Sequence, residues 1–170
     1  MLNINEEVPY FEGTAYTATG VKTVKSIDFK GKWLVLLFYV ADFSAVCPTE
    51  IIEFNKEYGR FDSNNADILG ISTDSVQDHE KLVNTNKDLS HLNFPLVSDS
   101  TGNIAKIFGI FDMVKKKIQR STVIINPDGL IKYFLVTDNY LGRNTEETYR
   151  ALKGLQSGKA CPVNWKAGDS

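Results

Sequence analysis

The stretch that decides the fold is Trp33-Leu-Val-Leu-Leu-Phe-Tyr-Val-Ala-Asp-Phe-Ser-Ala-Val-Cys-Pro-Thr-Glu50. Residues 33–40 are all apolar or aromatic, which is typical of a central parallel strand buried on both faces. A short loop follows. Cys47-Pro48 then opens a helix whose apolar positions recur at helical spacing, at Ile51, Phe54 and Tyr58. We expect Gly59 to end this helix. A buried strand that leads through a loop into a helix indicates an α/β fold.

Strand signals continue on both sides of this stretch. Residues 14–28 alternate weakly around Thr19-Gly20, which predicts an opening β-hairpin. Turn chemistry at Pro127-Asp128-Gly129 predicts a second hairpin, from residues 122–126 to residues 130–136. Two further strands and one short helix are expected at residues 66–72, 94–97 and 101–108.

Two more helices carry capping signals at their N-termini. Ser75 with Asp78 offers a capping box for a helix that reaches about Lys87. Asn144 with Glu147 offers the same signal for a last helix that reaches about Gln156.

The complete order of elements predicts one α/β domain over residues 1–156, with a mixed sheet flanked by helices and an N-terminal β-hairpin. A chain of 170 residues is long enough to bury a full core without disulfides or metal. Residues 157–170 contain two glycines, a proline and no periodicity. We therefore expect a flexible C-terminal tail there.

Composition excludes several classes of function. With 42% apolar residues, 24% charged residues and a net charge of −2, the chain has no basic field, so we do not expect a nucleic-acid partner. No apolar run approaches the length of a membrane span, and residues 1–10 resemble no secretory signal. A cytoplasmic protein without membrane contact is the expectation. His79 and His91 lack metal-ligand spacing, so no metal site is expected.

The chain has two cysteines, Cys47 and Cys161, which lie 114 positions apart. In a reducing cytosol a structural disulfide is disfavoured, and this gives weight to a catalytic or transient role. The alternative is that both are inert, because most cytosolic cysteines only fill space.

The surroundings of Cys47 favour chemistry over space filling. Cys47 lies in or beside the first turn of the expected helix, and Pro48 suits the first helical position. A thiol there faces the positive end of the helix dipole and several unpaired backbone N–H groups. Both features favour the thiolate, which is the nucleophilic form.

A thiolate that attacks an O–O bond also needs donors for the charge that develops on the departing oxygen. Ser44 can direct its hydroxyl at the same pocket, and the backbone N–H of Cys47 can join it. A guanidinium would stabilise both the thiolate and the leaving oxygen. Arg120, at the start of an expected strand, could supply it, although spacing alone would not select this arginine.

Several motifs, in their order along the chain, resemble the typical 2-Cys peroxiredoxins, and in particular those that form the C component of alkyl hydroperoxide reductase. The most specific is Asp42-Phe-Ser-Ala-Val-Cys-Pro-Thr-Glu50, which resembles the family's peroxidatic motif. The others are Phe29-Lys-Gly-Lys-Trp33, Arg120-Ser-Thr-Val-Ile-Ile-Asn-Pro-Asp-Gly129, Gly142-Arg143 and Ala160-Cys-Pro-Val-Asn-Trp-Lys166. The resemblance implies a thioredoxin-like fold, which agrees with the order of elements.

The resemblance also implies a role for each matching residue. Cys47 would be the peroxidatic cysteine, and Ser44 the hydroxyl that hydrogen-bonds thiolate and peroxide. Arg120 would be the activating guanidinium that contacts the substrate together with Ser44 and Cys47. Glu50 and Arg143 would complete a charged network that orients Arg120. Cys161 would be the resolving cysteine, which attacks the Cys47 sulfenic acid, usually on the partner subunit.

The implied function is the reduction of hydrogen peroxide and small organic hydroperoxides, without a metal, haem or flavin of the chain's own. The implied reductant is a dithiol partner, either thioredoxin-like or a flavoprotein disulfide reductase. The implied assembly is a homodimer, or a ring of dimers such as a decamer. Two alternative functions remain. One is a thiol–disulfide oxidoreductase, which the lack of a Cys-x-x-Cys motif opposes, and the other is a holdase or redox sensor.

The chain departs from the family pattern in three places. Val40 stands where the family has a proline that shields the sulfur. The Gly-Gly-Leu-Gly insertion of sensitive eukaryotic members is absent from residues 86–95. Nine residues follow Cys161, without the Tyr-Phe helix that clamps the active-site helix. Val40 would favour overoxidation of Cys47 if it loosens the shield, but the missing clamp is the larger effect, so we expect Cys47 to resist overoxidation.

Overall fold

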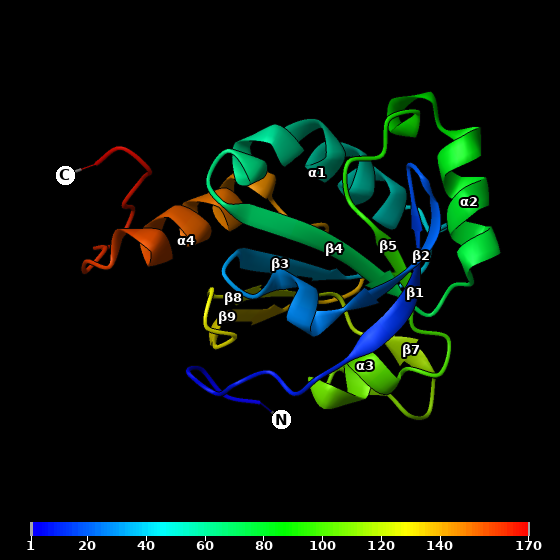
Figure 1. Ribbon diagram of the computed structural model, residues 1–170, viewed down its shortest axis with the longest axis horizontal. Helices are drawn as coiled ribbons and strands as arrows, with labels where there is room; N and C mark the ends of the chain where they lie inside the picture. The colour runs from blue at the N-terminus through cyan, green and yellow to red at the C-terminus, as the bar shows by residue number, and fades with distance from the viewer. Residues whose placement is uncertain (1, 170) are drawn as a thin grey trace.

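A seven-stranded mixed sheet forms the centre of the molecule, in the order β2-β1-β5-β4-β3-β8-β9 (Figure 1). The structure is a computed structural model, and it describes residues 2–169. The strands of the sheet are β1 (Glu12–Thr17), β2 (Gly20–Lys25), β3 (Trp33–Phe38), β4 (Ala66–Ser72), β5 (Leu96–Ser98), β8 (Ser121–Ile125) and β9 (Ile131–Val136). A separate small hairpin pairs β6 (Phe111–Asp112) with β7 (Lys117–Ile118).

The helices are α1 (Cys47–Asp62), α2 (Val76–Thr85), α3 (Asn103–Ile107) and α4 (Thr145–Ser157). Two short 3-10 helices, η1 (Ser26–Phe29) and η2 (Lys87–Leu89), join neighbouring elements. The mixed sheet, its flanking helices and the N-terminal β1–β2 hairpin confirm the thioredoxin-like fold predicted from the sequence.

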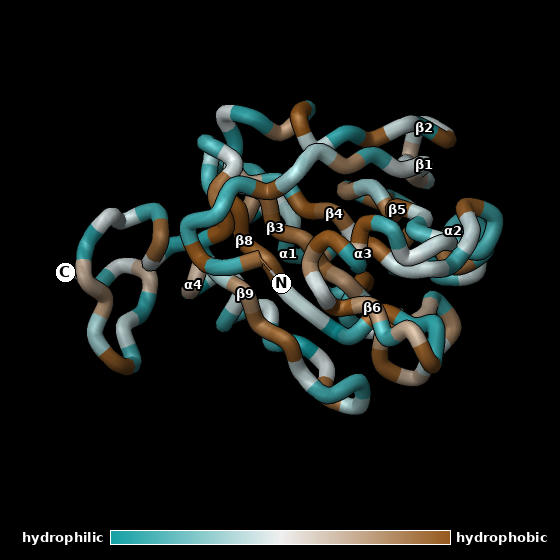
Figure 2. Tube along the Cα trace, turned by 90° about the horizontal axis from the view of Figure 1, so that it is seen from below, coloured by the Kyte–Doolittle hydropathy of each residue, from teal (hydrophilic) through white to brown (hydrophobic). Residues whose placement is uncertain are grey.

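The apolar run of β3 serves two cores because alternate side chains of a strand point to opposite faces. Val35 and Leu37 pack with the helices α1, α2 and α4. Leu34, Leu36 and Phe38 face the other side of the sheet, where they pack with α3 and the N-terminal segment. Figure 2 shows hydrophobic residues concentrated along the central strands. The strand is central as predicted, but only β4 pairs with it in parallel, and β8 pairs with it antiparallel.

The expectation that Gly59 ends the first helix is wrong. Helix α1 continues through Gly59 to Asp62. The added turn buries Phe61, whose ring lies 6.1 Å from that of Phe54 and 5.7 Å from that of Tyr149 on α4. Burial of one aromatic side chain stabilises by about 2 kcal/mol, which exceeds the cost of about 1 kcal/mol for a helical glycine.

Strand pairing brings distant segments to the C-terminal end of β3. Phe38, the last residue of β3, pairs with Ser121, the first residue of β8, and Ser121 pairs in turn with Val136 at the end of β9. The segment before β8 and the segment after β9 therefore both lie beside the loop that leads from β3 into α1. Among residues 2–169, no helix is both long and apolar enough to cross a membrane.

Candidate active site

Cys47 is the first residue of α1, and its side chain is fully buried. Pro48 takes the second helical position, one later than expected, where its missing N–H also costs no intrahelical bond. The backbone N–H of Cys47 donates to the hydroxyl oxygen of Ser44 at 3.1 Å. This N–H was expected to face the pocket, but it instead holds Ser44 in place. The Ser44 hydroxyl proton remains available as a donor.

Arg120 reaches the sulfur from the neighbouring strand. Its side chain is 1% exposed, and Nη2 donates to Cys47 Sγ at 3.4 Å. The same Nη2 donates to the carbonyl oxygen of Asn139 at 2.8 Å, and the backbone N–H of Arg120 donates to Asn139 Oδ1 at 3.0 Å. Sequence reasoning missed Asn139, because no local signal marks a residue that acts through its carbonyl oxygen.

Glu50 lies between two buried guanidinium groups. Its Oε1 accepts from Arg120 Nη1 and, at 3.1 Å, from Arg143 Nη2. Its Oε2 accepts from the backbone N–H and the Nε of Arg143, at 2.7 and 2.9 Å. Arg143 Nη1 also donates to the carbonyl oxygens of Phe38 and Ser121, at 2.9 and 2.7 Å. The guanidinium of Arg143 thereby joins α1, β3 and β8 at one point.

The charges of the three ionised side chains around Cys47 do not cancel. Arg120 and Arg143 bring two positive charges, and Glu50 brings one negative charge. Burial lowers the pKa of Arg143, and the ion pair with Glu50 opposes that effect. An arginine starts so high that it stays charged at any working pH. A buried uncompensated charge is costly, so the excess positive charge makes this cluster suited to hold an anionic group.

A pocket of about 490 Å³ opens beside Cys47. Its lining combines the loop before α1 with the β6–β7 hairpin and the segment after β9, and includes Val40, Ser44, Val46, Lys115, Lys117, Arg120, Thr137 and Tyr140. Two buried polar atoms of its lining residues, Arg120 Nε and Thr137 Oγ1, have no hydrogen-bond partner. Val40, at the family's proline position, is half-buried on this lining.

A buried polar network behind the Cys47 loop escaped sequence reasoning. Tyr39, Asp42 and His79 are fully buried. The Tyr39 hydroxyl donates to Asp42 Oδ1 at 2.6 Å, and His79 Nδ1 lies 2.6 Å from Asp42 Oδ2. His79 Nε2 faces the carbonyl oxygen of Val97 at 3.1 Å. The available signal was helical spacing, since His79 lies three positions before the buried Leu82 on the same face of α2.

Burial raises the pKa of two groups in this network, Tyr39 and Asp74. Burial raises the pKa of Tyr39 well above its usual value, and the nearby Asp42 adds to the effect, so the hydroxyl keeps its proton and remains a donor. Asp74 Oδ2 accepts from the backbone N–H of Asp42 at 2.9 Å and from the Ser72 hydroxyl at 2.7 Å. Burial raises the pKa of Asp74, and the bond from Ser72 opposes the shift.

Cys161 lies apart from the other predicted residues. It is partly exposed, and its Sγ lies 3.7 Å from the carbonyl oxygen of Gly154 in the last turns of α4. The same end of α4 contacts Asn64, which follows α1, through Lys153 Nζ at 2.7 Å and Gln156 Nε2 at 2.6 Å. Cys161 therefore lies near the C-terminal end of α1. Cys47 is at the N-terminal end of the same helix, which has 16 residues and is about 24 Å long.

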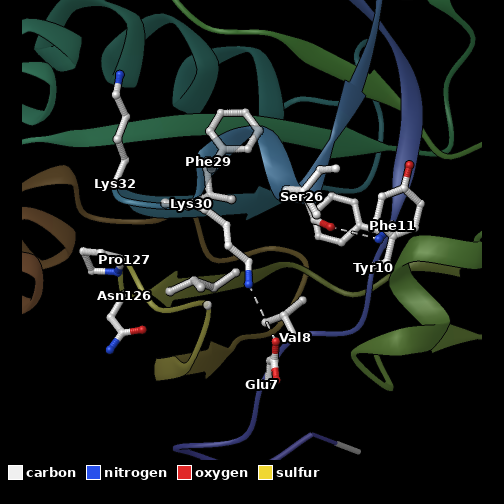
Figure 3. A pocket seen from close by; sticks show the side chains of 14 residues that line it. Glu7, Val8, Tyr10, Phe11, Ser26, Phe29, Lys30, Lys32, Asn126 and Pro127 are labelled. Atoms are coloured by element: carbon white, nitrogen blue, oxygen red, sulfur yellow. Dashed lines mark hydrogen bonds and ion pairs between the residues drawn. The ribbon is translucent and has the colours of Figure 1, made fainter.

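A second pocket, of about 150 Å³, lies at the opposite end of β3 from Cys47 (Figure 3). Lys30 and Glu7, which both line it, form an ion pair at 3.9 Å, and Phe11 and Phe29 also belong to its lining. None of the predicted site residues lines it. Within residues 2–169, no cluster of three or more His, Cys, Asp or Glu side chains is arranged to hold a metal ion.

The sequence matches the family model described as AhpC/TSA family over residues 4–134. The chain belongs to the AhpC/TSA family. Within it, the chain is a peroxiredoxin of the AhpC type, which confirms the resemblance drawn from the motif at residues 42–50. The roles of Cys47, Ser44 and the other site residues stay predictions.

Named relatives agree with this membership. The bovine (Bos taurus) mitochondrial thioredoxin-dependent peroxide reductase is 40% identical over 95% of this chain, which spans 66% of that relative's length. The thioredoxin peroxidase of Fasciola hepatica is 35% identical, over 98% of this chain and 89% of the relative.

Two solved structures share the fold and at least 30% of the aligned residues. The reduced 2-Cys peroxiredoxin of Plasmodium vivax superposes with a TM-score of 0.93 at 30% identity, over 100% of this chain and 92% of the other. Mycobacterium tuberculosis AhpC superposes with a TM-score of 0.88 at 32% identity, over 98% and 99% of the two chains.

Proposed function

We propose that this chain reduces hydroperoxides with Cys47 as the attacking thiolate. The observation that carries the proposal is the Arg120 guanidinium, 3.4 Å from a buried sulfur at a helix N-terminus. The names of the relatives, a thioredoxin-dependent peroxide reductase and a thioredoxin peroxidase, support the same chemistry.

In the first step the Cys47 thiolate attacks the terminal oxygen of a hydroperoxide R–O–O–H. The S–O bond forms, the O–O bond breaks, and Cys47 becomes a sulfenic acid while R–O⁻ departs and takes up a proton as the alcohol or as water. Arg120 and the Ser44 hydroxyl hydrogen-bond the oxygens as charge moves onto the leaving one. Their positions are fixed before the substrate arrives, since Glu50 and Asn139 hold Arg120 and the Cys47 N–H holds Ser44.

In the second step the Cys161 thiolate attacks the sulfenic sulfur, which forms a disulfide and releases hydroxide. The helix length of about 24 Å between the two cysteines supports an intersubunit disulfide in a homodimer or a ring of dimers, with Cys161 contributed by the partner. A dithiol reductant then restores both thiols by exchange. The name of the bovine relative supports a thioredoxin-like reductant. Residues 157–170 would serve as the segment that delivers Cys161.

The test is peroxide consumption with dithiothreitol as the reductant, which reduces a sulfenic acid directly. The wild type and Cys161→Ser should both consume hydrogen peroxide, and Cys47→Ser should not, because a serine hydroxyl is a poor nucleophile at neutral pH. Residual consumption by Cys47→Ser within tenfold of the wild type would move the chemistry away from Cys47 and overturn the proposal.

A further inference from the structure

The pocket beside Cys47 is much larger than hydrogen peroxide requires. A water molecule takes a share of about 30 Å³ in the liquid, so a molecule with two oxygens needs roughly twice that. The pocket has about 490 Å³, which falls in the range of sites that hold small organic molecules. Apolar groups from three elements supply part of its wall, at Val46, Ile118 and Tyr140. This space fits a substrate with an organic body.

Two lysines on the rim give the pocket entrance a positive charge. Lys115 and Lys117 line it from the β6–β7 hairpin, and among residues 2–169 neither has a carboxylate within ion-pair distance. The lining carboxylates are already engaged. Asp112 Oδ1 accepts the backbone N–H groups of Val114 and Lys115, both at 2.9 Å, and Asp138 Oδ1 accepts that of Tyr140 at 2.9 Å. The two ammonium groups remain available to an anion.

Two residues that line the pocket, Arg120 and Thr137, each have one buried polar atom without a hydrogen-bond partner. Arg120 Nε and Thr137 Oγ1 are buried without a hydrogen-bond partner, although most buried polar atoms have one. Arg120 is 1% exposed, so solvent does not satisfy its Nε. A ligand oxygen that reached either atom would remove the cost of leaving it unsatisfied.

We infer that this pocket selects organic hydroperoxides that carry an anionic group, such as a carboxylate at the far end of an apolar chain. Lys115 and Lys117 attract and bind the anionic group, while the peroxide end lies toward Arg120 and Thr137 in the same lining. The inference rests on the proposed function and names the substrate class of the same site.

The reaction keeps the balance of the first step. The Cys47 sulfur takes the terminal oxygen, the O–O bond breaks, and the organic alkoxide gains a proton, so the product is the corresponding hydroxy acid. Lysines near the pocket mouth also raise the encounter rate of an anionic substrate, an effect that salt screens.

The test uses linoleic acid hydroperoxide and its methyl ester, which differ in the anionic group alone. The second-order rate of Cys47 oxidation is measured for each by stopped-flow fluorescence at low and high salt. For the wild type we expect the acid to react about tenfold faster than the ester at low salt, with a ratio near one at high salt. The double variant Lys115→Gln/Lys117→Gln should bring the ratio near one at low salt.

Lys116 provides the matched control, because it belongs to the same run of lysines but does not line the pocket. Lys116→Gln should keep the wild-type ratio. Equal rates for acid and ester in the wild type, or a ratio that the double variant leaves unchanged, would overturn the inference. So would a double variant that loses acid and ester reactivity equally, because that result assigns the lysines a structural role. Failure of hydrogen peroxide to oxidise Cys47 would instead defeat the proposed function.

Discussion

The two ends of α1 hold the two cysteines in opposite kinds of environment. At the N-terminal end, Cys47 is fully buried beside charged side chains. Hydrogen bonds there join α1, the end of β3, Arg120 before β8 and Arg143 before α4. At the C-terminal end, Cys161 is partly exposed, and the contacts of its sulfur are at 3.6 to 3.7 Å. Figure 1 shows the segment after α4 extending away from the sheet. Under the proposed function, the difference suits an attacking cysteine that is held in place and a resolving cysteine whose contacts are easily broken.

Removing the negative charge of Glu50 should destabilise the N-terminal end of α1 more than any of the substitutions that follow. Glu50→Gln removes the only carboxylate within residues 2–169 that pairs with the two buried guanidinium groups, and we expect a loss of about 3–5 kcal/mol in the free energy of unfolding. Urea denaturation measures it. Glu53→Gln is the control, because Glu53 is exposed on the same helix. Equal losses for the two variants would contradict the account of the charge cluster.

The network behind the Cys47 loop should be the next most sensitive. His79→Leu leaves the buried carboxylate of Asp42 with one fewer donor, which should cost about 2–3 kcal/mol in the same assay. His91→Leu replaces the exposed histidine and should change stability by less than about 0.5 kcal/mol. If the two variants behaved alike, the network would have no role in holding the loop.

Arg120→Lys tests geometry at constant charge. A lysine ammonium cannot reach Cys47, Glu50 and Asn139 in the fixed directions of a guanidinium. We expect the second-order rate with hydrogen peroxide to fall about tenfold, which corresponds to about 1.4 kcal/mol. Arg150→Lys, far from the pocket on α4, should leave the rate unchanged. An unchanged rate in Arg120→Lys would show that the guanidinium of Arg120 takes no part in the reaction with peroxide.

The smallest effect is expected at the other end of α1. Reduced Cys161→Ser should unfold within about 0.5 kcal/mol of the wild type, because the contacts that it loses are long and partly exposed. Thermal denaturation of the reduced proteins measures this. A loss of more than about 1 kcal/mol would show that the segment is anchored rather than readily released.

The sequence predicted what depends on local pattern. The continuous apolar run at residues 33–40 predicted a buried strand, and the capping box at Ser75 predicted the start of a helix. Both elements are present. Gly59 misled because its local preference was outweighed by the packing of Phe61. The two-residue strands β6 and β7 went unpredicted, since no periodicity can be read from two residues.

The candidate site was predictable to the extent that its motif is recognisable. Cys47 stood out through its helix position, whereas Glu50 and Arg143 were implied only by the resemblance, because no spacing rule links residues 93 positions apart. The burial of His79 depends on packing between α2 and the sheet, so its bond to Asp42 could not be read from either segment alone.

The most direct test of the central claim is complementation between two cysteine variants. Cys47→Ser and Cys161→Ser chains are co-expressed with different tags, purified as a mixed assembly and treated briefly with hydrogen peroxide. The account predicts a reducible species of doubled mass, in which Cys47 of one chain is bonded to Cys161 of the other, and none from either variant alone. Absence of this species, together with an internal Cys47–Cys161 bond in oxidised wild type by peptide mapping, would contradict it.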